Sequence, residues 1–153
     1  MKTIKSPRLL WCCVVLPLLL AGCNTGFSQK DVNAMRSLTP KQRDQVGYEL
    51  AAELRRTSLS DTKQYRIRDI RYRSNSDTLV YDVEMKGMEG YKPDAATRKR
   101  LKQEGDKLIV QAACENRKMR SVVMDARFGI EFRMKNGRGV ELMRPRIAPG
   151  GCP

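Results

Sequence analysis

The hydrophobic pattern divides the chain into an apolar leader and a periodic remainder. Residues 9–20 (LLWCCVVLPLLL) carry no charge and follow three basic residues, which is the layout of a secretory signal peptide. The run covers twelve positions, whereas a bilayer-spanning helix needs about 20. We therefore expect residues 1–22 to be a signal peptide that is removed.

Helical periodicity begins at Thr39. The sequence Thr39-Pro40-Lys41-Gln42 offers an N-cap, a proline at the first helical position and the glutamine of a capping box. Val46, Leu50 and Leu54 then form one apolar stripe up to about Arg56. The pattern predicts a helix whose stripe packs in the core, with a partner-binding face as the alternative.

The residues before this helix are mostly polar. Residues 24–30 have the composition of a flexible tether, and residues 31–36 indicate at most a helical turn. We therefore place the lipidated N-terminus and tether at residues 23–37 and a single globular domain at residues 38–153.

Two hairpins are predicted further along. β-Forming residues at 65–73 change parity between Ile67 and Ile70, which indicates a bulge, and turn chemistry at 74–77 leads into an alternating strand at 78–86. In the second hairpin, residues 128–135 alternate before an Asn-Gly pair, and a return strand begins at residue 140. The intervening segment predicts a helix capped by Asp94 and a shorter helical piece. The fold class is thus α+β, a small antiparallel sheet of two hairpins packed against two or three helices.

The end of the leader contains a candidate lipidation site. Leu20-Ala21-Gly22-Cys23 resembles the lipobox of bacterial lipoproteins. The resemblance implies that Cys23 carries acyl chains and becomes the first residue of the mature chain, and that Asn24 directs it to the outer membrane, facing the periplasm. The alternative is ordinary secretory cleavage with Cys23 merely nearby.

Two cysteines remain after the leader and the lipidation site are set aside. Cys114 and Cys152 are an even pair in an oxidising compartment, which predicts one disulfide. A catalytic Cys114 is the competing hypothesis, but a thiol nucleophile usually needs a base, and the sequence has no histidine.

The absence of histidine also removes most enzymatic sites. Histidine-based triads and His-ligated zinc are impossible, and the acids at strand positions, among them Asp82 and Glu131, are interpreted as solvated. We expect no enzyme, no catalytic residues, no cofactor and no metal.

The charge of the mature chain is strongly positive. Without the three basic residues of the leader it has 27 basic and 17 acidic residues, a net charge of +10. This favours acidic partners or anionic headgroups, or simply keeps a tethered domain in solution. No basic tail or aromatic-interleaved motif is present, so we expect no nucleic-acid binding.

Several motifs in the second half resemble one family. The chain is similar to the small lipoprotein pilotins of the AspS-like (GspS-beta) class in the segments Ala113-Cys114-Glu115-Asn116, Met119-Arg120-Ser121-Val122-Val123, Gly129-Ile130-Glu131-Phe132 and Asn136-Gly137, and in Cys152. In that class, a cysteine near a helix end pairs with one after the last hairpin. The resemblance leaves most of residues 30–90 uncovered, and the many arginines depart from the family pattern.

The resemblance implies a function. Pilotins bind a short segment, commonly a C-terminal helix, of a secretin subunit, and direct the secretin to the outer membrane for assembly. We therefore expect a monomeric domain that binds a secretin or another secretion-system subunit and is held to the membrane by its lipid. The candidate partner-binding residues are Val46, Leu50, Leu54, Leu79, Tyr81, Phe128 and Phe132.

Other roles fit the same features. One is a structural lipoprotein of a conjugation, type III or type IV pilus apparatus. A lysozyme inhibitor is disfavoured because animal lysozymes are basic, and a binder of anionic envelope polymer would act through the arginines.

Overall fold

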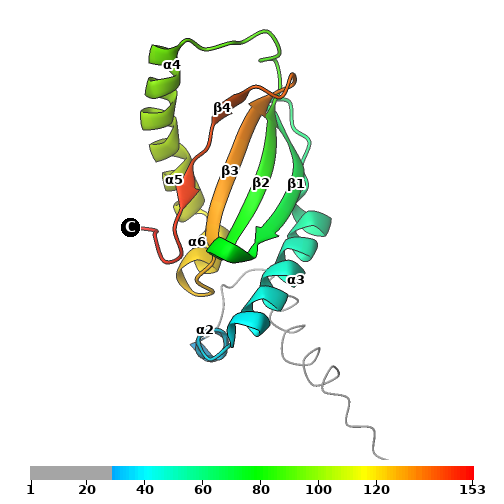
Figure 1. Ribbon diagram of the computed structural model, residues 1–153, viewed down its shortest axis with the longest axis vertical. Coiled ribbons are helices and arrows are strands. Elements are labelled where there is room, and N and C mark those ends of the chain that lie inside the picture. The colour runs from blue at the N-terminus through cyan, green and yellow to red at the C-terminus, as the bar shows by residue number, and fades with distance from the viewer. Residues whose placement is uncertain (1–28) are drawn as a thin grey trace, which may run out of the picture.

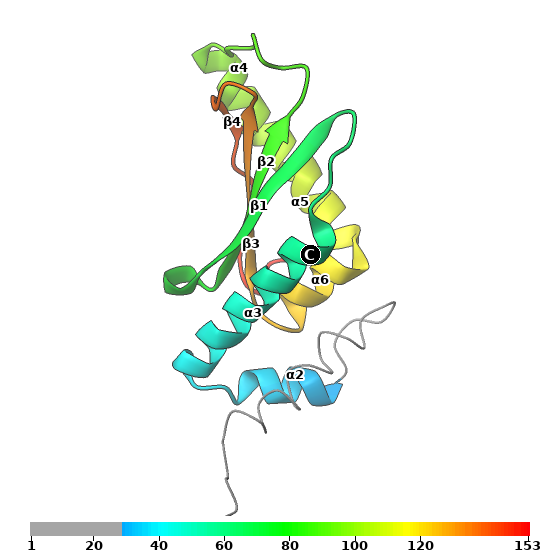
Figure 2. The same cartoon turned by 90° about the vertical axis from the view of Figure 1, so that its right-hand side faces the viewer.

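The computed structural model describes residues 29–153, which form a five-stranded sheet with helices on one face (Figures 1 and 2). The helices are α2 (Gln29–Arg36), α3 (Pro40–Ser58), α4 (Ala95–Arg100), α5 (Asp106–Glu115) and α6 (Arg117–Met124), with short helical turns η1 (Ser74–Ser76) and η2 (Leu101–Gly105). The strands are β1 (Tyr65–Arg73), β2 (Thr78–Met85), β3 (Gly129–Asn136), β4 (Glu141–Met143) and β5 (Arg146–Ile147). The α+β class is confirmed.

The capping box predicted for α3 is present. The Gln42 backbone N–H donates to Thr39 Oγ1 at 3.3 Å, and the Thr39 N–H donates to Gln42 Oε1 at 2.9 Å. Two backbone donors that the helix leaves unpaired are therefore satisfied.

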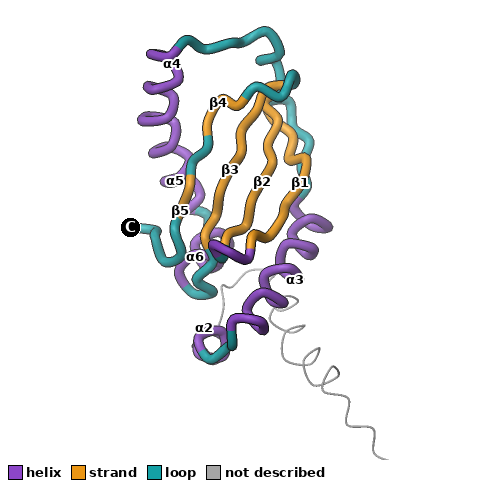
Figure 3. The backbone as a smooth tube through the Cα atoms, viewed as in Figure 1, coloured by secondary structure: helices purple, strands orange, loops and turns teal. Residues whose placement is uncertain are grey.

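Both predicted hairpins form, but the way they join differs from expectation. β1 and β2 pair antiparallel with a register shift between Ile67 and Asp69, so the bulge is confirmed, and β3 pairs antiparallel with β4 and β5 (Figure 3). At the centre, however, β2 and β3 run parallel. The expectation of a wholly antiparallel sheet is wrong there because α4 to α6 form a crossover that returns the chain to the start of β2.

The folded unit includes residues that the sequence assigned to the tether. In α2, Val32 and Met35 are buried, and Met35 belongs to the hydrophobic core. The signal peptide and Cys23 lie outside the described residues.

The crossover helix is interrupted. Asp94 caps α4 by accepting from the Thr97 N–H at 2.7 Å, as predicted, and η2 then inserts a π-helical turn before α5. An extra residue in a turn rotates the following residues about the helix axis. Beyond this turn, Leu108 is 67% exposed, whereas Ala113 and Cys114 are buried.

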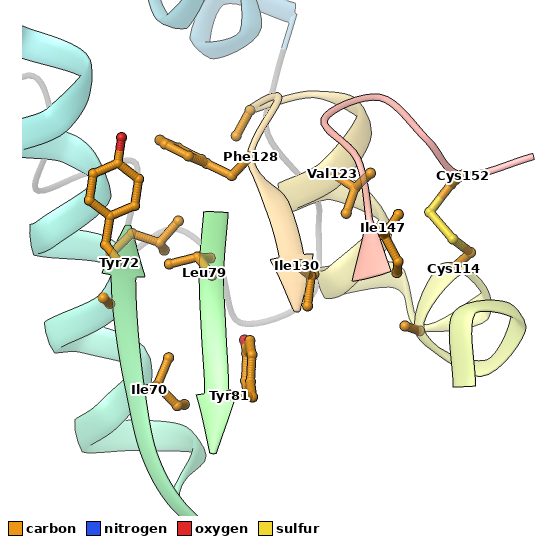
Figure 4. Packing of buried hydrophobic residues seen from close by; sticks show 14 of the residues in the cluster. Ile70, Tyr72, Leu79, Tyr81, Cys114, Val123, Phe128, Ile130, Ile147 and Cys152 are labelled. Atoms are coloured by element: carbon orange, nitrogen blue, oxygen red, sulfur yellow. A yellow bond between two sulfur atoms is a disulfide. The ribbon is translucent and has the colours of Figure 1, made fainter. Parts of the chain in front are cut away.

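The core lies between the sheet and the helices (Figure 4). The ring of Tyr72 on β1 packs edge-on against Tyr48 of α3, with centroids 5.1 Å apart, and against Phe128, at 5.8 Å. The predicted disulfide joins Cys114 at the end of α5 to Cys152, with their Cα atoms 5.5 Å apart. This bond fixes the C-terminal residues to the body of the domain.

Gly47 permits the close approach of α3 to β1, and the sequence pattern did not identify it. A Cβ atom at this position would lie 2.5 Å from the Tyr72 ring, which is buried and whose hydroxyl is 2.5 Å from Asp77 Oδ1. Gly to Ala inside an exposed helix usually stabilises by about 1 kcal/mol. Here we expect Gly47→Ala to destabilise by about 1 to 3 kcal/mol through overpacking.

Urea unfolding of the wild type and of Gly47→Ala, followed by circular dichroism, measures the change in the free energy of unfolding. Ala52→Gly, on an exposed position of the same helix, controls for helix propensity alone. A more stable Gly47→Ala protein would contradict the packing described for α3.

Candidate peptide-binding surface

The residues predicted from the sequence to bind a partner fall into two groups. Val46, Leu50, Leu79 and Phe128 are buried in the core, so in this structure they offer no exposed face to a partner. Tyr81 is buried as well, whereas Leu54 and Phe132 are only partly buried and pack against the core. A partner-binding role for any of these residues stays a prediction.

The pairing register of the strands shows which parts of the helix-bearing face are buried. Paired residues of neighbouring strands form rows of side chains across the helix-bearing face. The first row is Tyr72, Leu79, Ile130 and Ile147, and all four are buried. The next is Ile70, Tyr81 and Phe132, and the third is Ile67, Val83, Met134 and Met143. The first row is wholly buried, whereas Phe132 in the second row and Ile67, Met134 and Met143 in the third are only partly buried.

We call the partly exposed end of this face the apolar strip. Its members are half-buried and pack against the core: Leu54, Ile67, Met85, Phe132 and Met134. The strip lies between elements that cover its neighbours, because α3 packs over β1 while η2 and α5 pack against β4 and β5 (Figure 1). The strip is therefore the part of this face that is least covered by helices.

The strip has a rigid base and an adaptable rim. The Tyr81 and Phe132 rings lie 5.2 Å apart at its base, and burial raises the pKa of Tyr81 to about 12, so its hydroxyl stays neutral. Met85 and Met134 are unbranched and polarisable side chains that adjust to irregular apolar partners. Such a surface is suited to the apolar face of a short helix.

Basic residues lie near the same end of the sheet. Arg98, Lys99 and Arg100 form the last turn of α4, which projects beside this end in Figure 1. A positive rim raises the association rate of an acidic segment more than it raises affinity.

A hollow lies beside the disulfide, and no motif in the sequence predicts it. It has a volume of about 470 Å³ and is lined by Lys107, Val110, Gln111, Cys114, Glu115, Arg120 and Pro153. Arg120 Nη1 donates to the Pro153 carbonyl oxygen at 3.0 Å and so closes one side. Within residues 29–153, no three histidine, cysteine or acidic side chains gather as metal ligands would.

Comparison with known proteins supports a fold-level conclusion. No protein-family model matches the sequence, and no curated protein matches it. Among solved structures, EpsS, the pilotin of the Vibrio vulnificus type 2 secretion system, matches with a TM-score of 0.56 at 14% identity over 74% of this chain and 94% of EpsS. AspS, the type II secretion system pilotin of Vibrio cholerae, matches with a TM-score of 0.52 at 14% identity over 74% of this chain and 94% of AspS.

This chain has a pilotin-like fold. The structure thus supports the resemblance noted in the sequence, and it extends the likeness to parts of the chain that carry no shared motif. A third structure, of the PA3611 protein from Pseudomonas aeruginosa, matches with a TM-score of 0.54 at 11% identity over 76% of this chain and 98% of that protein, and it is not named as a pilotin. At sequence identities of 11 to 14%, the likeness shows a shared fold and does not show a shared function.

Two features bear on membrane attachment, the helices of the folded domain and the cysteine at residue 23. None of the helices in residues 29–153 is both long and apolar enough to cross a bilayer. Attachment through Cys23 is a proposal, since that residue lies outside the described part.

Proposed function

We propose that this chain is an outer-membrane lipoprotein that acts as a pilotin, binding a short segment of a secretin subunit and directing the secretin to the outer membrane for assembly. The observation that carries the proposal is the pilotin-like fold, joined to a lipobox-like leader in the same chain. The acyl chains on Cys23 would specify the membrane, and the folded domain would hold the cargo.

We further propose that the apolar strip contacts the secretin segment. Phe132 and Met134 are half-buried on the helix-bearing face, on the strand that runs between the parts covered by α3 and α5. Burying the remaining exposed area of such side chains stabilises a complex by about 25 cal/mol per Å². A few such anchors usually carry most of the binding energy of an interface.

The test is affinity capture of secretin by the tagged, full-length protein from a detergent extract of the envelope, with the retained proteins identified by mass spectrometry. Secretin recovery is expected to fall about tenfold for the variant Phe132→Asp/Met134→Asp, since a lost contact energy of about 1.4 kcal/mol changes affinity tenfold. Leu59→Asp/Leu108→Asp is the matched control, because it adds the same two negative charges at exposed apolar positions outside the strip.

Thermal unfolding checks that each variant is folded. Recovery of neither a secretin nor another assembly subunit would refute the proposal. Recovery of a conjugation, type III or type IV pilus subunit in place of a secretin would assign the chain to that machine.

A further inference from the structure

The face of the sheet opposite the helices is charged. No helix of the described chain covers it (Figures 1 and 2). Because side chains alternate along a strand, Glu131 points to this face while Ile130 and Phe132 point to the helices. Register places Glu131 in a row with Val80 of β2, Arg71 of β1 and Arg146 of β5.

Glu131 lies at the centre of an arginine cluster. Arg146 Nε lies 2.6 Å from Glu131 Oε2, Arg73 Nη2 lies 2.9 Å from Oε1, and Arg133 Nε lies 3.1 Å from Oε1. Arg144 Nε is at 4.0 Å and pairs more closely with Glu141, at 2.7 Å. The Glu131 side chain is 0% exposed, so the expectation of a solvated acid at this strand position is wrong: the guanidinium groups cover it.

The cluster is short of negative charge. Among the side chains that the structure describes, Glu131 is the only carboxylate within 4 Å of Arg73, Arg133 or Arg146. Three guanidinium groups carry about fifteen N–H donors, whereas one carboxylate offers about four acceptor sites. The Arg146 side chain is 57% exposed, so donors remain directed to solvent above the buried acid.

The ionisation of Glu131 preserves this arrangement. Burial alone would raise its pKa, but hydrogen bonds and charge from Arg73, Arg133 and Arg146 outweigh burial and lower the pKa below its ordinary value. Glu131 is therefore ionised at neutral pH, and the cluster carries a net charge of +2 from three arginines and one glutamate.

The rest of the same face limits what can bind there. Farther along the sheet, Asp82 pairs with Arg71 and Glu84 pairs with Arg68. An extended anionic surface laid flat on the sheet would meet these carboxylates as well as the arginines. A short acidic segment can contact the arginines alone. The guanidinium groups also come from β1, β3 and β5, so they are spread over several strands and suit several separate carboxylates.

We propose that the helix-free face, centred on Arg73, Arg133 and Arg146, is a second docking surface that binds an acidic segment of a protein partner. The surface is distinct from the apolar strip, which lies on the other face, and it does not depend on the pilotin role. Arginine suits this task because its planar group pairs with carboxylates bidentately.

The test uses the full-length protein in non-ionic detergent and a fluorescent octaglutamate peptide as the probe, with affinity measured by anisotropy at low salt. Arg133→Gln/Arg146→Gln is expected to weaken binding about tenfold, from two ion pairs of moderate strength. Arg73 still pairs with Glu131 in this variant. Arg36→Gln/Arg117→Gln, at exposed positions of α2 and α6, removes the same charge elsewhere and is expected to change affinity less than about twofold.

A third variant separates docking from a purely structural role. Glu131→Gln removes the internal competitor, so peptide affinity should rise about threefold, whereas a cluster that serves stability alone would show no gain. Arg146→Gln alone, at the most exposed arginine, replaces the double variant if the latter unfolds. Equal weakening by both double variants would overturn the proposal, as would binding to phosphatidylglycerol vesicles or polyphosphate without binding to the peptide.

Discussion

Replacing Cys114 and Cys152 with alanine is expected to lower the free energy of unfolding by roughly 3 to 4 kcal/mol. The bond closes a loop with a sequence separation of 38 residues, and loop-closure entropy of the unfolded chain gives a gain of that size. Both half-cystines are buried in the core, so the substitution also removes packing.

Urea unfolding of the oxidised wild type and the double variant measures the effect. Reduced wild type serves as the control, because it loses the bond but keeps both side chains. A difference below about 1 kcal/mol would show that other contacts hold the C-terminal residues, such as the hydrogen bond from the Gly150 N–H to the Val123 carbonyl at 2.9 Å.

Cys23→Ser is expected to have the largest effect on location. Each buried methylene contributes about 0.8 kcal/mol to membrane attachment, and two or more acyl chains hold a protein on a bilayer essentially permanently. A serine offers no thiol for the thioether. The wild type should sediment almost wholly with salt-washed membranes, and the variant should appear almost wholly in the released fraction.

The matched control is Cys12→Ser, which removes a thiol from the leader and should leave the distribution unchanged. Intact mass spectrometry of the purified wild type should show the added mass of acyl chains on a chain that begins at Cys23. An unacylated wild type that distributes as the variant does would support ordinary secretory cleavage instead.

Local features of the fold could be read from the sequence because they depend on neighbouring residues. The Thr39–Gln42 capping box, the bulge after Ile67 and the cap at Asp94 all follow from short patterns and all form. The parallel pairing of β2 with β3 could not be predicted in this way. A hairpin pattern specifies pairing within the hairpin and carries no information on how two hairpins meet.

The candidate site was predictable only in part, for a related reason. Alternation along β2 identified Leu79 and Tyr81 as members of one face, but whether a helix covers that face depends on tertiary packing. Leu79 is buried, and the partly exposed strip begins beyond Tyr81. Glu131 illustrates the same limit, because its burial arises from arginines that the sequence places on three different strands.

The most direct test of the central claim is the location of assembled secretin in the organism that carries this chain. Cell envelopes from strains with the wild type or Cys23→Ser would be separated by density, and detergent-resistant secretin multimers measured in each fraction. A pilotin requires that the multimers lie in the outer-membrane fraction in the wild type and be lost from it, or appear in the inner membrane, in the variant. Outer-membrane multimers at equal level in both strains would contradict the role proposed for this protein.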